Sequence, residues 1–177
     1  MKRARIKIAL AVAAVGVVGL GTVAMASDGG DERVTLTGYE EVPALSTPGV
    51  GDFRASVSRS SDEIRYRLTF SGLETAATQA HIHFENETNN GNIVVFLCTN
   101  LGNGPAGTQA CPAAGGTIRG TITPADIGAG AAGQGIAAGE FDEFVRAIRA
   151  GATYVNVHSD GRPTGEIRAQ LNDDDND

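Results

Sequence analysis

The sequence predicts an all-β domain, either a β-sandwich or a closed barrel of seven or eight strands, with one short helix in a connection. Segments in which apolar and polar residues alternate recur along the chain, as is typical of strands with one buried face. Glycine makes up 24 of the 177 residues, which favours tight turns over long helices. Apolar residues at helical spacing mark a single short segment, residues 140–150.

Eight segments have the pattern of a strand. Residues 53–57 and 64–70 alternate and are joined by a short polar turn, which predicts a hairpin. Residues 93–97 are apolar throughout, as expected for a strand that is covered on both faces. The other five segments are residues 34–37, 80–85, 117–122, 154–158 and 166–171. So many short strands between turn residues predict a sandwich or a barrel.

The single helix is expected at residues 140–150. Four apolar residues from Phe141 to Ile148 follow the spacing i, i+3, i+4, i+7, and Gly151 ends the pattern. Upstream of it, Thr123 and Pro124 have the character of a helix cap and a first helical residue. Residues 172–177 form an acidic tail without an apolar side chain, and we expect this tail to be disordered.

The first 26 residues have the pattern of a secretory signal peptide. Four basic residues precede an apolar run at residues 8–23 and the cleavage pattern Ala24-Met25-Ala26. The alternative is an uncleaved anchor, but the run is shorter than the roughly 20 residues that a membrane span requires. We therefore expect a protein that is secreted, periplasmic or held at the cell surface, without membrane association after cleavage. A flexible start at residues 27–32 would precede one domain at residues 33–171.

The charge of the chain excludes two classes of partner. The formal net charge is −7, and it becomes −11 once the four basic residues of the leader are removed. A surface of that sign repels phosphate backbones and anionic lipids, so neither nucleic acid nor a membrane surface is expected as a partner. We expect an extracytoplasmic protein or surface ligand, whose identity the sequence does not indicate.

Two cysteines, Cys98 and Cys111, follow the leader. In an oxidising compartment such a pair most simply forms one disulfide, and the glycine-rich segment between them has the composition of a loop. Closing a loop of this length stabilises a fold by roughly 3 kcal/mol in the chain-entropy description. Metal binding by the cysteine pair is the weaker alternative, because no further ligand pattern stands nearby in the sequence.

Five ordered segments of the chain resemble the CHRD (chordin) domain family over residues 33–171. They are Glu41-Val42-Pro43, Ala80-His81-Ile82-His83, and the segments at 120–126, 154–158 and 165–171. The resemblance implies an immunoglobulin-like β-barrel similar to that of Cu/Zn superoxide dismutase. It implies little about activity, because single-domain bacterial members have no agreed biochemical role. The cysteine-rich repeats of animal chordins, which antagonise growth factors, have no counterpart here.

All three histidines of the chain, His81, His83 and His158, lie in these segments. Side chains alternate across a strand, so His81 and His83 face the same way, about 6.6 Å apart along the strand. His158 shares the polar face of its own strand with Asn156 and Tyr154. If the two strands adjoin, the three imidazoles form one polar cluster on a sheet face or at the mouth of a barrel.

Two interpretations of this cluster remain open. In the first, the histidines bind a metal ion, Zn or Cu, with Glu85 or Glu166 as a carboxylate ligand or as a group that orients the imidazoles, and with Arg168 as a further supporting residue. In the second, the histidines are hydrogen-bonded in a structural polar patch in which Glu166 and Arg168 pair with each other. Both interpretations use the same face of the same strands.

Known catalytic patterns fit poorly. A superoxide dismutase uses more histidines than the three present. A cupin site would use His81, His83 and Glu87, but Thr75 and Val94 stand where its motif has glycines. Ser159 lacks the pattern of a serine nucleophile. We therefore expect a non-catalytic binding or structural module, with a metal-binding protein or metal-dependent enzyme as the alternative.

Overall fold

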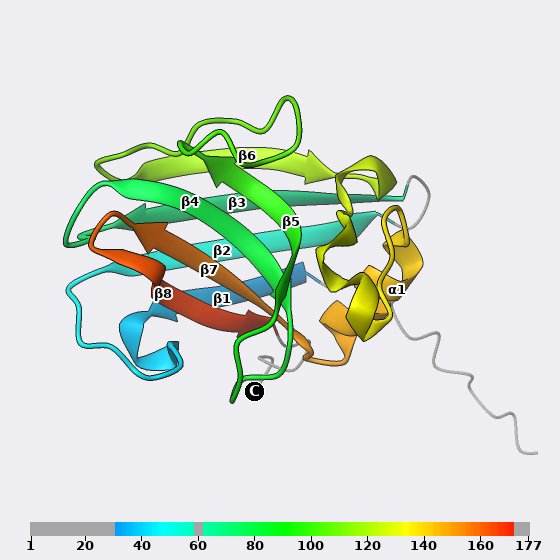
Figure 1. The fold of residues 1–177 in the computed structure, drawn as a ribbon, viewed down its shortest axis with the longest axis horizontal. Helices are drawn as coiled ribbons and strands as arrows, with labels where there is room; N and C mark the ends of the chain where they lie inside the picture. Colours follow the sequence, from blue (N-terminus) through cyan, green and yellow to red (C-terminus); the bar gives the residue numbers. More distant parts are fainter. Residues whose placement is uncertain (1–30, 59–61, 172–177) are drawn as a thin grey trace, which may run out of the picture.

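The computed structural model describes residues 31–58 and 62–171, and within them the chain forms one sheet of eight antiparallel strands (Figure 1). In spatial order the strands are β5, β4, β7, β8, β1, β2, β3 and β6. Their bounds are β1 Asp31–Thr37, β2 Val50–Ser58, β3 Glu63–Ser71, β4 Ala77–Phe84, β5 Asn92–Thr99, β6 Gly116–Ile122, β7 Thr153–Ser159 and β8 Arg162–Leu171. The expected all-β class is therefore confirmed.

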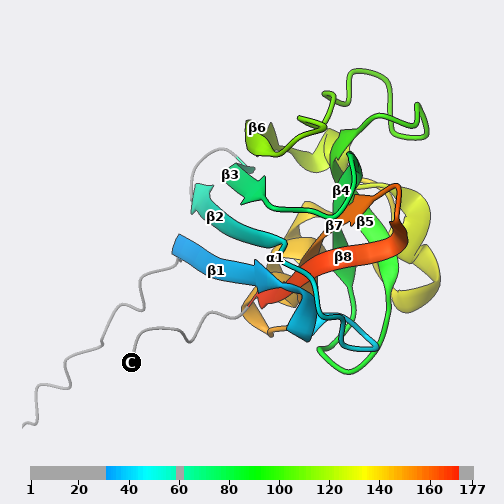
Figure 2. The same ribbon diagram turned by 90° about the vertical axis from the view of Figure 1, so that its left-hand side faces the viewer.

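The sheet curls into a nearly closed barrel. Figure 2 shows β1, β2, β3 and β6 on one side and β4, β5, β7 and β8 on the other. The edge strands β5 and β6 are not paired with each other, and the side chain of Gln109 bridges them. Its amide nitrogen lies 3.2 Å from the carbonyl oxygens of both Leu97 in β5 and Arg119 in β6, and it also donates to the Tyr66 hydroxyl.

The core lies inside the barrel and is formed by the inward half of each alternating strand. In β3 every second residue from Ile64 to Phe70 is buried and the residues between them face outward. Phe53, Phe70 and Leu68 are among the largest fully buried side chains. Full burial of each contributes about 2–3 kcal/mol. The period-two pattern thus fixes which side of each strand packs and which side is available for a site.

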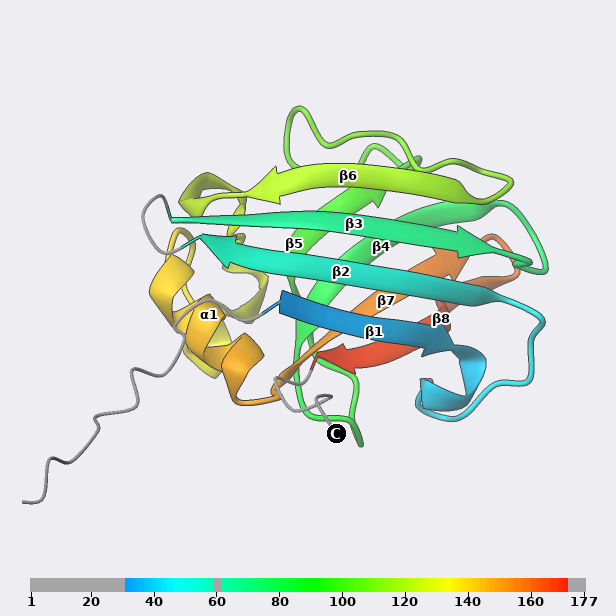
Figure 3. The same ribbon diagram turned by 180° about the vertical axis from the view of Figure 1, so that it is seen from behind.

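One α-helix, α1 at Phe141–Arg149, lies at one end of the barrel (Figures 1 and 3). Phe144 and Ile148 on its apolar side join the core, as the spacing of these residues predicts. Short 3-10 helices occupy Gly38–Glu40, Pro124–Asp126 and Ala129–Gln134, and the second of them is capped by Thr123. No helix among the described residues is long and apolar enough to cross a membrane.

Cys98 and Cys111 form the expected disulfide, with their Cα atoms 5.0 Å apart. The bridge ties β5 to the long loop that precedes β6. The Asn100 side chain reinforces this link, because it bonds to both the backbone N–H and the carbonyl of Cys111.

The first strand begins earlier than the sequence predicts. Residues 31 and 32 belong to β1 rather than to a flexible start, because the strand pairs along its whole length with β2, from Asp31 opposite Ser56 onward. The predicted signal peptide at residues 1–26, residues 27–30 and the acidic tail at 172–177 lie outside the described residues.

Candidate metal centre

The three histidines lie together on the outer face of β4 and β7. In β4, Ile82 points into the core, so His81 and His83 point outward. The pairing with β7 places Gln79 opposite His158 and His83 opposite Tyr154. Loops cover this face, and His81, His83 and His158 are only 0 %, 7 % and 5 % exposed. The outer face of these strands is therefore a buried polar site and not a solvent-exposed surface.

Irregularities in the strand pairing accompany each histidine. The register of β4 against β5 shifts between Ala80 and His81, and again between Ile82 and His83. The register of β7 against β8 shifts between Val157 and Ser159, at His158. Bulges of this kind turn side chains away from the direction that a regular pleat gives them and occur often beside functional sites.

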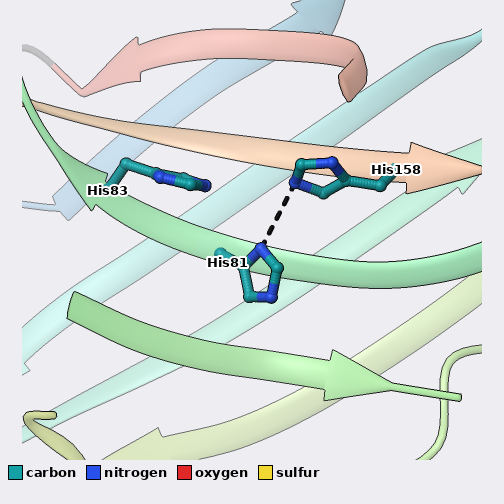
Figure 4. A group of neighbouring side chains, drawn as sticks. All are labelled: His81, His83 and His158. Atoms are coloured by element: carbon teal, nitrogen blue, oxygen red, sulfur yellow. Dashed lines mark hydrogen bonds between the residues drawn. The ribbon is translucent and has the colours of Figure 1, made fainter. Parts of the chain in front are cut away.

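The imidazoles point toward one another (Figure 4). His81 Nδ1 lies 3.3 Å from His158 Nε2, and one nitrogen from each ring can be chosen so that all three lie within 4.8 Å. Two nitrogens bound to one ion at about 2.1 Å are no more than about 4.2 Å apart, and a tetrahedral ion sets them at roughly 3.4 Å. The His81–His158 pair already has this spacing.

Backbone carbonyls fix the tautomers of two rings. His83 Nδ1 lies 3.0 Å from the carbonyl oxygen of Gly91, and His158 Nδ1 lies 3.1 Å from that of Pro163. A carbonyl only accepts, so both Nδ1 atoms carry the proton and both Nε2 atoms present a lone pair to the cluster. The Nε2 atom of His83 is buried without a hydrogen-bond partner. Metal-ligating histidines are oriented in the same way.

Burial keeps all three imidazoles neutral. It lowers the pKa of His81 to about 2, and the neighbouring His158 and His83 lower it in the same direction. Burial lowers the pKa of His83 and of His158 to about 4, although the Gly91 and Pro163 carbonyls oppose this shift. Only the neutral imidazole binds a metal ion, so the rings are in the ligating form throughout the physiological pH range.

Tyr154 and Arg168 support the cluster from behind His83. The Tyr154 ring is stacked on His83 with centroids 4.7 Å apart, and the Arg168 guanidinium carbon lies 3.5 Å from the centre of the Tyr154 ring. Arg168 also donates to the carbonyls of Asn86 and Asn89, each at 3.0 Å. The arginine thereby fastens the β4–β5 loop over the histidines, and its own side chain is fully buried.

The two carboxylates that the sequence suggested as further ligands lie elsewhere. Glu166 is buried and accepts hydrogen bonds from Thr47 Oγ1, the backbone N–H of Glu74 and Ser159 Oγ. Glu85 accepts from the backbone N–H of Asn86. Among the described residues no carboxylate joins the three histidines as a ligand group.

Glu166 and Arg168 do not pair with each other either. Their side chains bind different loops, Thr47 and Glu74 on one side and residues 86–90 on the other. Of the three residues suggested as supports for the imidazoles, Arg168 alone contacts the cluster, and it does so through Tyr154.

A second buried polar group borders the site. Asn156 Nδ2 donates to Glu41 Oε1 at 2.6 Å, and the Glu41 carboxylate lies against the Cα of Gly165. A Cβ atom at position 165 would lie 2.7 Å from Glu41 Oε1, so only glycine leaves room for this contact. Burial raises the pKa of Glu41 to about 7, although Asn156 and Arg168 lower it. These residues hold the first loop against β7 and β8.

A surface depression of about 700 Å³ leads to His83 along the free edge of β5. Gly91, Phe96 and Gly128 are among its lining residues. The Phe96 ring stands edge-on to His81, with centroids 4.4 Å apart. Of the three histidines, His83 alone lines this depression, which therefore offers an ion an approach to the cluster beside the Phe96 ring.

The sequence could indicate the histidines but not the groups that orient them. Period-two alternation places His81, His83 and His158 on outer faces. The carbonyls of Gly91 and Pro163 carry no side-chain signal, and the stacking of Tyr154 on His83 depends on strand order.

The CHRD family model matches residues 33–171, which is most of the chain. No curated protein and no solved structure matches the chain. The segments that resemble the family supply the histidines, Tyr154, Glu41, Gly165 and Arg168, which together build the buried site on β4, β7 and β8. The chain therefore belongs to the CHRD domain family.

Proposed function

We propose that this CHRD domain is an exported binding module that holds one transition-metal ion, Zn or Cu, through His81, His83 and His158. The observation that carries the proposal is the convergence of three buried imidazoles, two of which have Nδ1 tied to a backbone carbonyl and Nε2 directed inward. Imidazole is a good ligand for both metals.

The alternative, a structural polar patch, accounts less well for the same contacts. A patch is stable when each buried polar atom has a partner. Here His83 Nε2, whose ring is held by the Gly91 carbonyl on its other side, is buried without one. An ion at the centre would take the lone pair of His83 Nε2, and the tautomer of His81 with its proton on Nε2 would offer Nδ1 as the third ligand.

Holding the ion suits this site better than catalysis on a large substrate. All three ligands are less than a tenth exposed, and the cluster is covered by Phe96 and by the loop that Arg168 fastens. Three protein ligands leave a fourth position for water or a small ligand in a tetrahedral site. The rival function, a metal-dependent enzyme, would need that position to be reached from the depression beside His83.

Metal analysis of the protein purified from its exported location tests the proposal most directly, with stoichiometric Zn or Cu as the expected result. In addition, Zn²⁺ or Cu²⁺ should raise the melting temperature of chelator-treated protein. An ion at a hundredfold excess over Kd stabilises the fold by about 2.7 kcal/mol, which corresponds to roughly 5–10 °C for a domain of this size.

His83→Ala should abolish this rise, measured against the variant's own metal-free value. Phe96→Leu is the control, because it alters packing against His81 and removes no ligand atom, and it should keep the response. If the metal ion still raised the melting temperature of His83→Ala, the metal-binding proposal would be contradicted and the histidines would be assigned to a structural polar patch.

A further inference from the structure

The strands β1, β2, β3 and β6 form the side of the barrel that faces the viewer in Figure 3, opposite β4 and β7. Five exposed arginines lie on the outer face of these four strands. Four of them form a continuous row, the arginine row, with one residue on each strand. Arg33 lies opposite Arg54, Arg54 opposite Arg67, and Arg67 opposite Arg119. All four are exposed. With strands about 4.8 Å apart, the row spans roughly 14 Å.

The row is only partly neutralised. Asp52 lies between its first two members, 3.5 Å from Arg33 and 2.9 Å from Arg54. No acid among the described residues forms an ion pair with Arg67 or Arg119. Like charges directly opposite each other destabilise a sheet. A chain with a net charge of −7 has nonetheless placed four cations in one line, which points to an anionic ligand.

The residues beside the row indicate what kind of ligand fits. The neighbouring row on one side contains Thr35, Asp52, Thr69 and Thr117, and the row on the other side contains Asp31, Ser56, Arg65 and Thr121. The flanking rows thus hold mainly hydroxyls, together with two acids and a fifth arginine, Arg65, which lies 3.8 Å from Glu63. No aromatic side chain lies in these rows. A shallow depression of about 480 Å³ runs between Arg33, Arg54, Arg65 and Arg67, and the buried residues Glu32 and Tyr66 also line it.

We propose that the arginine row binds a linear anionic polysaccharide, whose carboxylate or sulfate groups lie across the strands against successive guanidinium groups. Arginine binds such groups with paired, directional hydrogen bonds, and the flanking hydroxyls suit the hydroxyls of a sugar. Single-stranded nucleic acid is bound on aromatic stacking surfaces, which these rows lack. A membrane surface would meet no apolar side chain in these rows for insertion.

The acidic remainder of the molecule affects the strength of binding but not its place. At physiological ionic strength the Debye length is about 8 Å, so distant carboxylates are largely screened while contacts at the row persist. Binding is therefore expected to be strongest at low salt and to weaken as salt rises, since its attraction is electrostatic.

Dextran sulfate and uncharged dextran are matched probes for the full-length protein, and polygalacturonate tests carboxylate in place of sulfate. Binding is measured by calorimetry at 50 and 200 mM salt. We expect dextran sulfate or polygalacturonate to bind, dextran not to bind, and affinity to fall at least tenfold between the two salt concentrations. The variant Arg67→Gln/Arg119→Gln should lose at least tenfold in affinity at 50 mM salt.

The control Arg146→Gln/Arg149→Gln removes the same charge from α1 and should change affinity less than twofold. Equal losses in the two double variants would show that net charge, and not the row, is responsible. Unchanged binding by Arg67→Gln/Arg119→Gln, or no binding to either anionic polysaccharide, would overturn the proposal. Tighter binding to a single-stranded oligonucleotide, or to phosphatidylserine vesicles, would replace it with that class of partner.

Discussion

Glu41 is a buried carboxyl group whose ionisation the fold opposes. Burial raises its pKa from 4.5 to about 7, and the hydrogen bond from Asn156 only partly offsets this effect. A raised pKa means that the folded state binds the proton more tightly than the unfolded state does. The stability contributed by Glu41 is therefore fully present below pH 4.5 and is lost as the pH rises through about 7.

Glu41→Gln should remove this loss while keeping an acceptor for Asn156. Relative to the wild type, the variant should gain on the order of 3 kcal/mol in unfolding free energy between pH 4.5 and pH 8. Urea unfolding at several pH values in the presence of a chelator measures the difference. Glu40→Gln, the same change at the exposed neighbour, is the control, and an equal gain in both variants would contradict the assignment to Glu41.

At the residue scale, the sequence indicates the three candidate metal-binding histidines better than it indicates the residues that hold them in place. His81, His83 and His158 could be placed on outer faces because a strand repeats every two residues. The contact of Glu41 with Gly165 joins residues more than a hundred positions apart, and no local pattern records it. The expected pairing of Glu166 with Arg168 is wrong for the same reason, since each side chain binds a loop whose position depends on the folded barrel.

At the scale of elements, alternation predicts strands and faces but not neighbours. The segments at 53–57 and 64–70 lie in β2 and β3, which do pair, and residues 140–150 contain α1. The order of the sheet, in which β7 lies between β4 and β8, could not be predicted, because period two says nothing about which strand lies alongside. Yet this order is what places His158 beside His81 and His83.

The side chain of Gln109 bridges the two unpaired edge strands, β5 and β6, along the line where the barrel closes (the seam). Gln109 Nε2 contacts Leu97 O, Arg119 O and the Tyr66 hydroxyl, so its loss leaves carbonyls of both edge strands without this donor. Gln109→Ala should lower the unfolding free energy by about 1–3 kcal/mol. Amide hydrogen exchange should quicken in β5 and β6 more than in β2.

Gln134→Ala is a suitable control, because the exposed Gln134 donates to the carbonyl of Phe84 and accepts from Asn92 at the start of β5, and makes no bond to β6. Equal effects of the two variants on exchange in β6 would contradict a role for Gln109 in closing the barrel.

At the scale of the whole molecule, the two polar faces of the barrel are built differently. The face of β4, β7 and β8 is covered by loops and encloses neutral imidazoles. The face of β1, β2, β3 and β6 is open and carries a row of exposed arginines that is only partly neutralised. The net charge argues against nucleic acid and anionic membrane surfaces as partners, but it does not reveal the arginine row, because composition averages over faces that the fold separates.

The buried groups also set how the stability of the whole molecule depends on pH. The pKa values of the three histidines are lowered from 6.5, so their burial destabilises the fold as the pH falls below 6.5 and the unfolded chain takes up three protons. Glu41 has the opposite effect on the unfolding free energy, because its pKa is raised and the folded state therefore binds its proton more tightly than the unfolded state does. Near pH 5 the unfolded state therefore binds about two protons more than the folded state, three on imidazoles less one on Glu41.

The unfolding free energy of metal-free protein should consequently fall by roughly 2–3 kcal/mol per unit as the pH is lowered from 6 to 5. That is a large share of the 5–15 kcal/mol that stabilises an ordinary domain. Urea unfolding at pH 5, 5.5 and 6 with a chelator measures the slope, and Glu41→Gln should make it steeper by about one proton, or roughly 1.4 kcal/mol per unit. A flat profile, or stability that rises on acidification, would show that the histidines are not held neutral by burial.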